Sequence, residues 1–338
     1  KLAFLIPGQG SLYSGMTKAL YEHFEAYRSN FDYCAEILQN LMQMDVRPLI
    51  FEESEANDRR LSQTAVTQPV LFASSYSLAK FLQSIGITPK SILGHSLGEY
   101  VAACLAGVFS VEDGLKVVVA RAKLMQNSPV EGGMSVVQLG EEKVLPYLVG
   151  ALSIAAINEP SCCTVSGPVT DLSKLESTLE KEGVTIQRLN TSGAFHNELM
   201  NYVSDPLCEL FASIPLHEPE IPIVSNVTGD WLSASDATDP QYWARQMLAP
   251  VQYVKGLQRL TDSHDACIEV GAGHGLASLA KRQGWGKKAF HIVPNKQESY
   301  GNKDLHLTLE TLGTLWTKSY PVQWLQLFSQ RLYCPEST

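Results

Sequence analysis

The stretch Ser91-Ile92-Leu93-Gly94-His95-Ser96-Leu97-Gly98 decides the fold of this chain. It joins a short apolar run, typical of a buried strand, to a segment with helical periodicity, and a serine stands in the turn between them. Gly94 and Gly98 flank this serine because larger side chains would collide with the neighbouring strand and helix. The pattern therefore predicts a sharp strand-to-helix turn that presents the hydroxyl of Ser96 beside the N–H groups that open the helix.

Strand-like and helix-like segments alternate on both sides of this turn. The alternation predicts an α/β fold with a mainly parallel sheet that helices cover on both faces, as in an α/β-hydrolase-like subdomain. We expect strands at Leu2–Ile6, Ser91–Leu93, Ile221–Ser225, Cys267–Val270 and Phe290–Val293, and helices at Gln68–Leu82, Glu99–Ala106 and Glu112–Met125.

The rhythm changes between about Gly132 and Asn190, where the segments read β-α-β-β-α-β. This is the order of a ferredoxin-like unit, and its position predicts a small subdomain inserted into the larger one. We therefore divide the chain into a large subdomain (residues 1–130 and 193–298), a ferredoxin-like subdomain (131–192) and a C-terminal linker-like segment (299–338) that packs on the body. The expected elements of the insertion are Met134–Leu139, Glu142–Val149, Ser153–Ile157, Cys163–Ser166, Leu172–Glu182 and Thr185–Leu189.

Composition excludes several classes of function. Of the 338 residues 45% are apolar and 18% charged, and a net charge of -9 without a long Lys/Arg run argues against a nucleic-acid surface. No apolar stretch approaches the roughly 18 residues needed to cross a membrane. The seven cysteines lack CxxC spacing, so we expect reduced thiols and a cytoplasmic protein. The glycines of residues 271–275 lack the register of a dinucleotide fingerprint.

A serine nucleophile needs a general base, and eight histidines are available. His196 is the best candidate because it follows the last strand of the inserted unit, where a loop returns to the cleft. His95 points away from the serine in a sharp turn, and His274 lies at a helix start. A third group should orient the base. No aspartate stands out, and a backbone carbonyl has no residue-type signature, so the residues alone leave this group open.

Seven short motifs together resemble one known family, the malonyl-CoA:acyl carrier protein transacylases and the related acyltransferase domains of polyketide synthases. They occur in family order over nearly the whole chain, which makes coincidence far less plausible than for the serine turn alone. The motifs are Pro7-Gly8-Gln9-Gly10-Ser11, Thr67-Gln68-Pro69, residues 94–100, residues 121–126, Gly193-Ala194-Phe195-His196, residues 225–229 and Glu269-Val270-Gly271.

The resemblance implies a role for each matching residue. Ser96 is similar to the nucleophile that carries the acyl group as an ester, and His196 to its general base and later acid. The backbone N–H groups of Gln9 and Leu97 resemble the oxyanion hole. Arg121 is similar to the arginine that grips the free carboxylate of a malonyl unit, since a guanidinium matches two carboxylate oxygens with two parallel donors.

Further positions follow from the same resemblance. Gln68 and His95 are expected near the bound acyl group, and Phe195 belongs to a motif associated with malonyl rather than methylmalonyl units. The family orients its histidine with a main-chain carbonyl in a segment like residues 250–252, which makes Gln252 the candidate. Gly193 departs from the frequent His-Ala-Phe-His motif. Ala249 stands where asparagine is frequent, which puts the shape of the acyl pocket in doubt.

The activity that the resemblance implies is a ping-pong transfer of a malonyl group from malonyl-CoA to the phosphopantetheine thiol of an acyl carrier protein. The resemblance implies no metal and no cofactor, because the coenzyme A thioester is itself the substrate. It leans toward polyketide over fatty acid biosynthesis, in a free-standing enzyme or an excised synthase domain. An acyl hydrolase that clears stalled carrier proteins and a non-catalytic docking module are the alternatives.

Overall fold

Two sheets organise the molecule, which the computed structural model describes for residues 1–191, 193–299 and 301–330. The larger sheet has the strand order β7-β2-β1-β8-β9, and every pairing in it is parallel. The expected α/β fold with a mainly parallel sheet is confirmed. Its strands are β1 (Leu2–Ile6), β2 (Ser91–Gly94), β7 (Ile223–Val224), β8 (Ala266–Glu269) and β9 (Ala289–His291).

The central strand β1 shows why helices cover this sheet on both faces. Successive side chains of a strand point to opposite faces, and in β1 both sets are apolar and buried. Phe4 and Ile6 belong to one core cluster, with α2, α5, α6 and α7, whereas Ala3 and Leu5 belong to a second, with α13 and α14. These helices are α2 (Glu25–Met42), α5 (Thr64–Ser84), α6 (Leu97–Leu105), α7 (Val111–Gln126), α13 (Tyr253–Thr261) and α14 (Gly275–Ala280).

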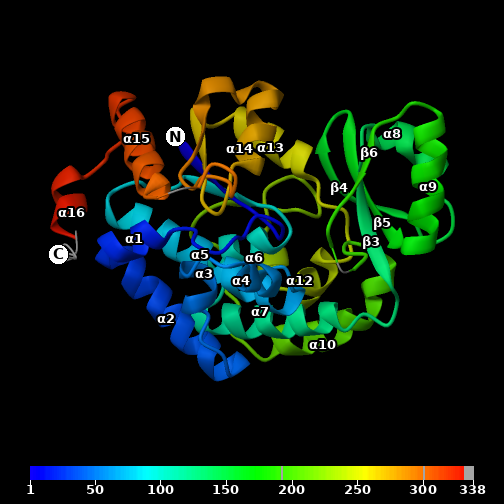
Figure 1. Ribbon diagram of the computed structural model, residues 1–338, viewed down its shortest axis with the longest axis horizontal. Helices are drawn as coiled ribbons and strands as arrows, with labels where there is room; N and C mark the ends of the chain where they lie inside the picture. Colours follow the sequence, from blue (N-terminus) through cyan, green and yellow to red (C-terminus); the bar gives the residue numbers. More distant parts are fainter. Residues whose placement is uncertain (192, 300, 331–338) are drawn as a thin grey trace.

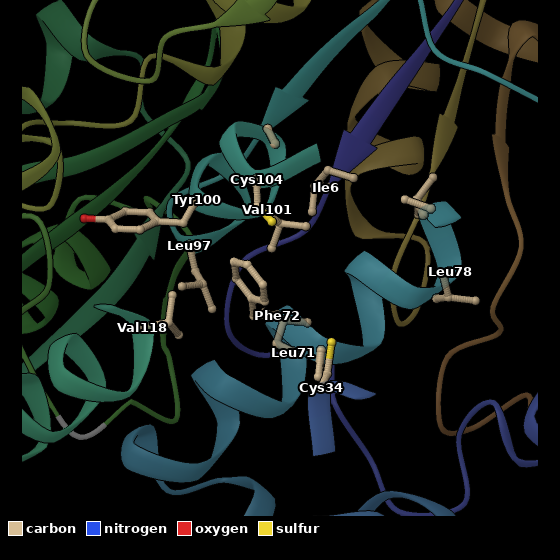
Figure 2. Close-up of a cluster of buried hydrophobic side chains, with 14 of the residues drawn as sticks. Ile6, Cys34, Leu71, Phe72, Leu78, Leu97, Tyr100, Val101, Cys104 and Val118 are labelled. Atoms are coloured by element: carbon tan, nitrogen blue, oxygen red, sulfur yellow. The ribbon is translucent and has the colours of Figure 1, made fainter. Parts of the chain in front are cut away.

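Figure 2 shows the first of these clusters close to the serine turn. Leu97 and Val101 of α6 lie among side chains of α5 and α7, including Phe72 and Val118, all buried. The first turn of α6 is thus held by apolar contacts with α5 and α7.

The remaining helical segments connect and cover these elements. The helices are α1 (Lys18–His23), α3 (Arg47–Phe51), α4 (Glu55–Leu61), α10 (Asn201–Ala212), α11 (Ala234–Ala237), α12 (Pro240–Gln246), α15 (Lys303–Thr317) and α16 (Trp324–Ser329), with 3-10 turns at Leu145–Tyr147, Glu198–Met200 and Gly286–Lys288 and a π turn at Lys281–Trp285.

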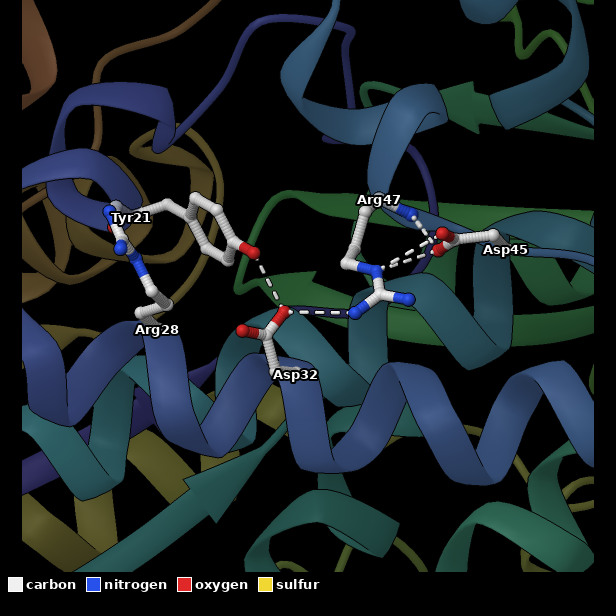
Figure 3. Close-up of polar contacts among 5 residues, drawn as sticks. All are labelled: Tyr21, Arg28, Asp32, Asp45 and Arg47. Atoms are coloured by element: carbon white, nitrogen blue, oxygen red, sulfur yellow. Dashed lines mark hydrogen bonds and ion pairs between the residues drawn. The ribbon is translucent and has the colours of Figure 1, made fainter.

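A polar cluster joins the first three helices (Figure 3). Asp32 of α2 accepts a hydrogen bond from the hydroxyl of Tyr21 and pairs with Arg47 of α3 at 3.3 Å. Arg47 also binds Asp45 just before α3, and the guanidinium of Arg28 lies 5.2 Å from the centre of the Tyr21 ring. This cluster supports the outer edge of the large subdomain.

The second sheet is antiparallel, has the order β4-β5-β3-β6 and stands at one side of the molecule (Figure 1). The element order matches the predicted β-α-β-β-α-β unit, and α9 packs on the sheet through Leu172, Leu175 and Leu179. The elements are β3 (Gly132–Val137), α8 (Glu141–Val144), β4 (Ser153–Glu159), β5 (Cys162–Pro168), α9 (Val169–Lys181) and β6 (Ile186–Arg188).

The two subdomains are joined by backbone hydrogen bonds at Val251. Its N–H donates to the carbonyl of Ala155, and its carbonyl accepts from the N–H of Ile157, both at 2.9 Å. The segment between α12 and α13 therefore runs beside β4 like one more strand residue. This contact fixes the loop that follows α12 at the boundary of the two subdomains.

The C-terminal part begins with α15, whose buried face includes Leu312 and Leu315 and packs on the large subdomain. Of the predicted 299–338 segment, Tyr300 and residues 331–338 lie outside the described residues. Within the described part of the chain, no helix has the length and apolar character to span a bilayer.

Candidate active site

The serine turn is built by the two glycines that flank it. A Cβ on Gly94 would lie 2.1 Å from the backbone nitrogen of Glu99, and one on Gly98 would lie 2.1 Å from the carbonyl oxygen of Ile6. Such distances leave no room for a side chain, so strand and helix approach each other closely. Ser96 between them adopts φ 53° and ψ −113°, and its side chain is partly exposed.

The structure brings Ser96 and His196 into direct contact across 100 residues of sequence. Ser96 Oγ and His196 Nε2 are 2.7 Å apart, and His196 Nδ1 lies 2.8 Å from the carbonyl oxygen of Ala249. Because a carbonyl only accepts hydrogen bonds, Nδ1 carries the proton and Nε2 is free to accept the proton of Ser96. The arrangement is a serine–histidine pair with the base in the correct tautomer.

The prediction that Gln252 orients the histidine is wrong, because Ala249 supplies the carbonyl. Gln252 precedes the first residue of α13, and its own carbonyl accepts from the N–H of Gly256 at 3.0 Å. The group that contacts His196 lies three residues before Gln252, upstream of the point where Val251 pairs with β4. Sequence reasoning placed the group in the correct loop but had no residue-type signal for a carbonyl.

Burial sets the protonation state of the base. His196 is 4% exposed, and burial, assisted by the positive charge of Arg121, lowers its pKa from 6.5 to about 3. The pKa of His95 is also lowered by burial. Neutral imidazole is the form that can take a proton from a hydroxyl, so the base is ready for use at neutral pH.

Arg121 of α7 is buried without a carboxylate partner among the described residues. Its side chain is 1% exposed, Nη1 donates to Oε1 of Gln68 in α5, and Nε has no hydrogen-bond partner. The guanidinium carbon lies 5.2 Å from the centre of the Tyr100 ring, and burial lowers the arginine pKa. A buried cation without a counter-charge is costly, so the site suits an anionic ligand.

The loop after β1 lies against the serine turn. A Cβ on Gly8 would lie 2.7 Å from the carbonyl oxygen of His95 and 3.5 Å from Cβ of Ser96. The side chain of Gln9 donates to Oγ1 of Thr64 at 3.1 Å. Among the residues that the structure describes, no acceptor binds the backbone N–H of Gln9 or Leu97. Their role as an oxyanion hole stays a prediction that this geometry permits.

Two other predicted residues, His95 and Phe195, directly precede Ser96 and His196 in the chain. His95 Nε2 lies 2.8 Å from Oδ1 of Asn158, at the end of β4, so this ring links the serine turn to the small subdomain. Phe195 precedes the base and is 7% exposed, and a Cβ on Gly193 would lie 2.7 Å from its ring. Glycine at position 193, where the family motif frequently has histidine, therefore makes room for the ring of Phe195.

Asn226 binds the serine turn, a contact that the sequence does not predict. Its Oδ1 accepts from the backbone N–H of Ser96 at 2.6 Å, and its Nδ2 donates to the carbonyl of Gly94 at 2.7 Å. The amide thus binds the backbone on both sides of the strained turn. The motif at residues 225–229 was the available signal, but it does not state which backbone groups the asparagine meets.

A metal centre finds no support in the described residues, where no group of three or more His, Cys, Asp or Glu side chains is placed to hold an ion.

Comparison with known proteins places this geometry in a family. Residues 3–314 match the model of the acyl transferase domain. The chain is 32% identical over 328 residues to one component of the phenolphthiocerol/phthiocerol polyketide synthase of Mycobacterium tuberculosis, an alignment that covers 96% of this chain but 22% of that protein. The chain therefore spans less than a quarter of that relative's length.

Solved structures of two kinds are similar to the whole chain. The acyl transferase domain of ZmaA has a TM-score of 0.89 at 32% identity, covering 99% of this chain and 79% of that one. Malonyl CoA-acyl carrier protein transacylase from Clostridium perfringens has a TM-score of 0.82 at 26% identity, covering 94% and 99%. The chain belongs to the acyl transferase domain family and is an acyltransferase.

Proposed function

We propose that this enzyme moves a malonyl group from coenzyme A to the phosphopantetheine thiol of an acyl carrier protein through an ester on Ser96. The observation that carries the proposal is Arg121, a buried guanidinium with no carboxylate partner in the described part of the chain, close enough to the dyad for its charge to lower the pKa of His196. A malonyl unit differs from a simple acyl group by a free carboxylate, which this guanidinium would bind with two parallel hydrogen bonds.

The first half-reaction forms the ester. His196 Nε2 takes the proton of Ser96 while Oγ attacks the thioester carbonyl carbon, and the resulting oxyanion lies toward the N–H groups of Gln9 and Leu97. The carbon–sulfur bond then breaks, and His196 returns the proton to the departing coenzyme A thiolate. The second half-reaction is the reverse with the carrier thiol as nucleophile. This scheme needs no metal or redox cofactor.

Phe195 supports a preference for an unsubstituted malonyl unit. Its ring is buried, it directly precedes the base in the chain, and the family motif to which it belongs is associated with malonyl units. Discrimination against a single methyl group in such pockets is worth about 1–3 kcal/mol, so a methylmalonyl unit would be disfavoured but not excluded. The polyketide synthase relative supports a polyketide pathway as the setting.

Intact-mass analysis tests the proposal. The protein is mixed with malonyl-CoA, acetyl-CoA and a longer acyl-CoA, and the adduct on Ser96 is followed in the parent, Arg121→Ala and Arg259→Ala, which removes an arginine of the surface ion pair with Asp230. We expect a malonyl adduct in the parent and Arg259→Ala, but not in Arg121→Ala. Equal malonyl loading in all three would contradict the proposal.

The second candidate, an acyl hydrolase, is favoured by the partly exposed Ser96, which water can also approach. The same experiment separates the two, because a hydrolase would turn over unsubstituted acyl adducts to free acid without a carrier protein. A transferase would hold the malonyl ester until a carrier thiol arrives. A docking module would form no adduct at all.

A further inference from the structure

The turn that holds Ser96 is tied to a buried carboxylate that the proposed reaction does not use. Glu99, in the first turn of α6, is fully buried. Its Oε1 accepts from the backbone N–H of Asn226 at 3.2 Å and from the hydroxyl of Tyr242, and its Oε2 accepts from Nε2 of Gln246 at 2.9 Å. Three hydrogen bonds hold this buried carboxylate in place, because breaking any of them would leave a buried polar group unsatisfied.

Gln246 makes a second contact that reaches the nucleophile itself. The same Nε2 atom donates to the carbonyl oxygen of Ser96 at 2.9 Å. Gln246 is fully buried and is the last residue of α12. One amide therefore connects the backbone of Ser96, the side chain of Glu99 and the end of α12.

The end of α12 also determines the position of His196. The chain turns after Gln246, and three residues later the carbonyl of Ala249 accepts the hydrogen bond of His196 Nδ1 at 2.8 Å. The N–H of Ala249 donates to the carbonyl of Arg245, still within the last turn of the helix. A displacement of this helix end relative to the serine turn would therefore move the histidine relative to Ser96.

We propose that Gln246 is a positioning residue that sets the distance between the two catalytic groups. It holds α12 against the serine turn through Glu99 and the Ser96 carbonyl, and α12 in turn presents Ala249 to His196. The inference rests on the proposed nucleophile and base, but it holds for any acyl group that Ser96 accepts.

The expected consequence concerns reaction rate rather than binding. The side chain of Gln246 donates its hydrogen bonds to Glu99 and Ser96 rather than into the acyl pocket around Arg121, so its loss should leave recognition intact. Proton transfer between Ser96 and His196 depends steeply on their separation, and misplacements of about 1 Å can cost 100-fold in rate. Gln246→Met keeps the length of the side chain and removes both hydrogen bonds.

The test uses a fluorophosphonate probe, which reacts with an activated serine whatever the natural substrate. Ser96 Oγ displaces fluoride from phosphorus, His196 takes the proton, and intact mass measures the maximal labelling rate and the half-saturating probe concentration. We expect Gln246→Met to lower the maximal rate about 10- to 100-fold with the half-saturating concentration unchanged. Gln246→Asn is one methylene too short to reach both acceptors and should also lose rate; it replaces Gln246→Met if that variant does not fold.

Thr308→Val serves as the matched control for lost stability. Thr308 in α15 is fully buried, and its hydroxyl donates to the carbonyl of Ile292 at 2.9 Å, away from α6 and α12. We expect this variant to unfold at a lower temperature but to label at the parent rate. The inference would be overturned, with the proposed function intact, if the Gln246 variants were labelled at the parent rate. It would also be overturned if Thr308→Val lost as much labelling rate as they do. A parent that is not labelled at Ser96 would overturn it together with the proposed function.

Discussion

Both members of the proposed catalytic pair stand on strained backbone. Ser96 and His196 each have φ 53° and are two of the five non-glycine residues with positive φ in the described part of the chain. Such conformations cost of order 1–3 kcal/mol each and persist only where the surroundings enforce them. Asn226 enforces the first through hydrogen bonds to Ser96 and Gly94. These backbone conformations bring the hydroxyl of Ser96 and the imidazole of His196 into contact.

The charge of Arg121 predicts a pH effect at His196. Burial is the main cause of the lowered pKa of the base, and the guanidinium lowers it further because it repels a protonated imidazole. Arg121→Gln removes this repulsion, so protonation of His196, which inactivates the base, should set in at higher pH. We expect fluorophosphonate labelling of this variant to decline at a higher pH than labelling of the parent when the pH is lowered from 7 toward 4.

Arg121→Lys is the control for this prediction. It keeps a positive charge at the same position but not the fork of donors, so its labelling should keep the pH dependence of the parent. Identical pH profiles in all three proteins would show that the guanidinium charge does not act on the base.

At the residue scale, the sequence predicts those groups whose chemistry depends on a side chain. Ser96 follows from its glycines and His196 from its place after the inserted unit, and the structure brings both together. The carbonyl of Ala249 could not be found this way, because every residue carries one. The side chain of Asn226 binds the backbone of a residue 130 positions earlier in the chain, which no local pattern records.

At the scale of elements, the contact of β1 with α6 fixes where the nucleophile stands. Gly98→Ala would push a methyl group against the backbone of Ile6, which belongs to a strand and cannot move aside as a flexible side chain can. We expect the free energy of unfolding, measured by urea denaturation, to fall by about 1–3 kcal/mol, as for overpacked cores. Ser96 should also lose reactivity, because α6 must shift relative to β1.

Gly275→Ala is the matched control. This glycine begins α14, and a Cβ there would meet no atom within 4 Å. Alanine is the better helix former, so this variant should be as stable as the parent or slightly more stable. A similar loss in the free energy of unfolding of the two variants would mean that the close approach of α6 to β1 at Gly98 does not determine stability.

The sequence predicts an element well where its burial is uniform and poorly where its position depends on tertiary contacts. The apolar run Leu2–Ile6 became β1 without change, since both of its faces are buried. The predicted helix Gln68–Leu82 is longer in the structure, beginning at Thr64 and ending at Ser84. Helix α12 has seven residues and was not predicted individually. Its position depends on tertiary contacts of Tyr242 and Gln246 with Glu99, which its own sequence does not show.

At the scale of the whole molecule, the insertion separates the two proposed catalytic groups in sequence, whereas the fold brings them into contact. Ser96 lies in the first part of the large subdomain, before α6 and α7, and His196 lies where the chain returns from the antiparallel sheet. Val251 ties the loop of Ala249 to β4, and His95 reaches Asn158 at the end of the same strand. The small subdomain is therefore part of the support of the Ser96–His196 pair.

The buried titrating groups of the molecule predict how its stability depends on pH. Burial raises the pKa of Glu99 to about 7 and of Glu269 to about 8, from 4.5, and lowers that of His196 to about 3 and of His291 to about 4, from 6.5. The glutamates stabilise the fold at low pH, and this contribution is lost as pH rises toward their folded values. The histidines cost stability as pH falls below 6.5.

Between pH 4.5 and 6.5 the two effects oppose each other, whereas between pH 6.5 and 8 the glutamates dominate, because the histidines of the unfolded chain lose their remaining charge there. We therefore expect the free energy of unfolding, measured by urea denaturation, to fall across pH 6.5–8, by about 1–2 kcal/mol for Glu269. Glu269→Gln keeps an oxygen for the N–H of Ala277, which now binds Oε2, and should flatten this decline. Glu310→Gln, at an exposed position, should retain it. A decline of equal slope in both variants would show that Glu269 stays ionised in the folded protein, its burial offset by the N–H groups at the start of α14.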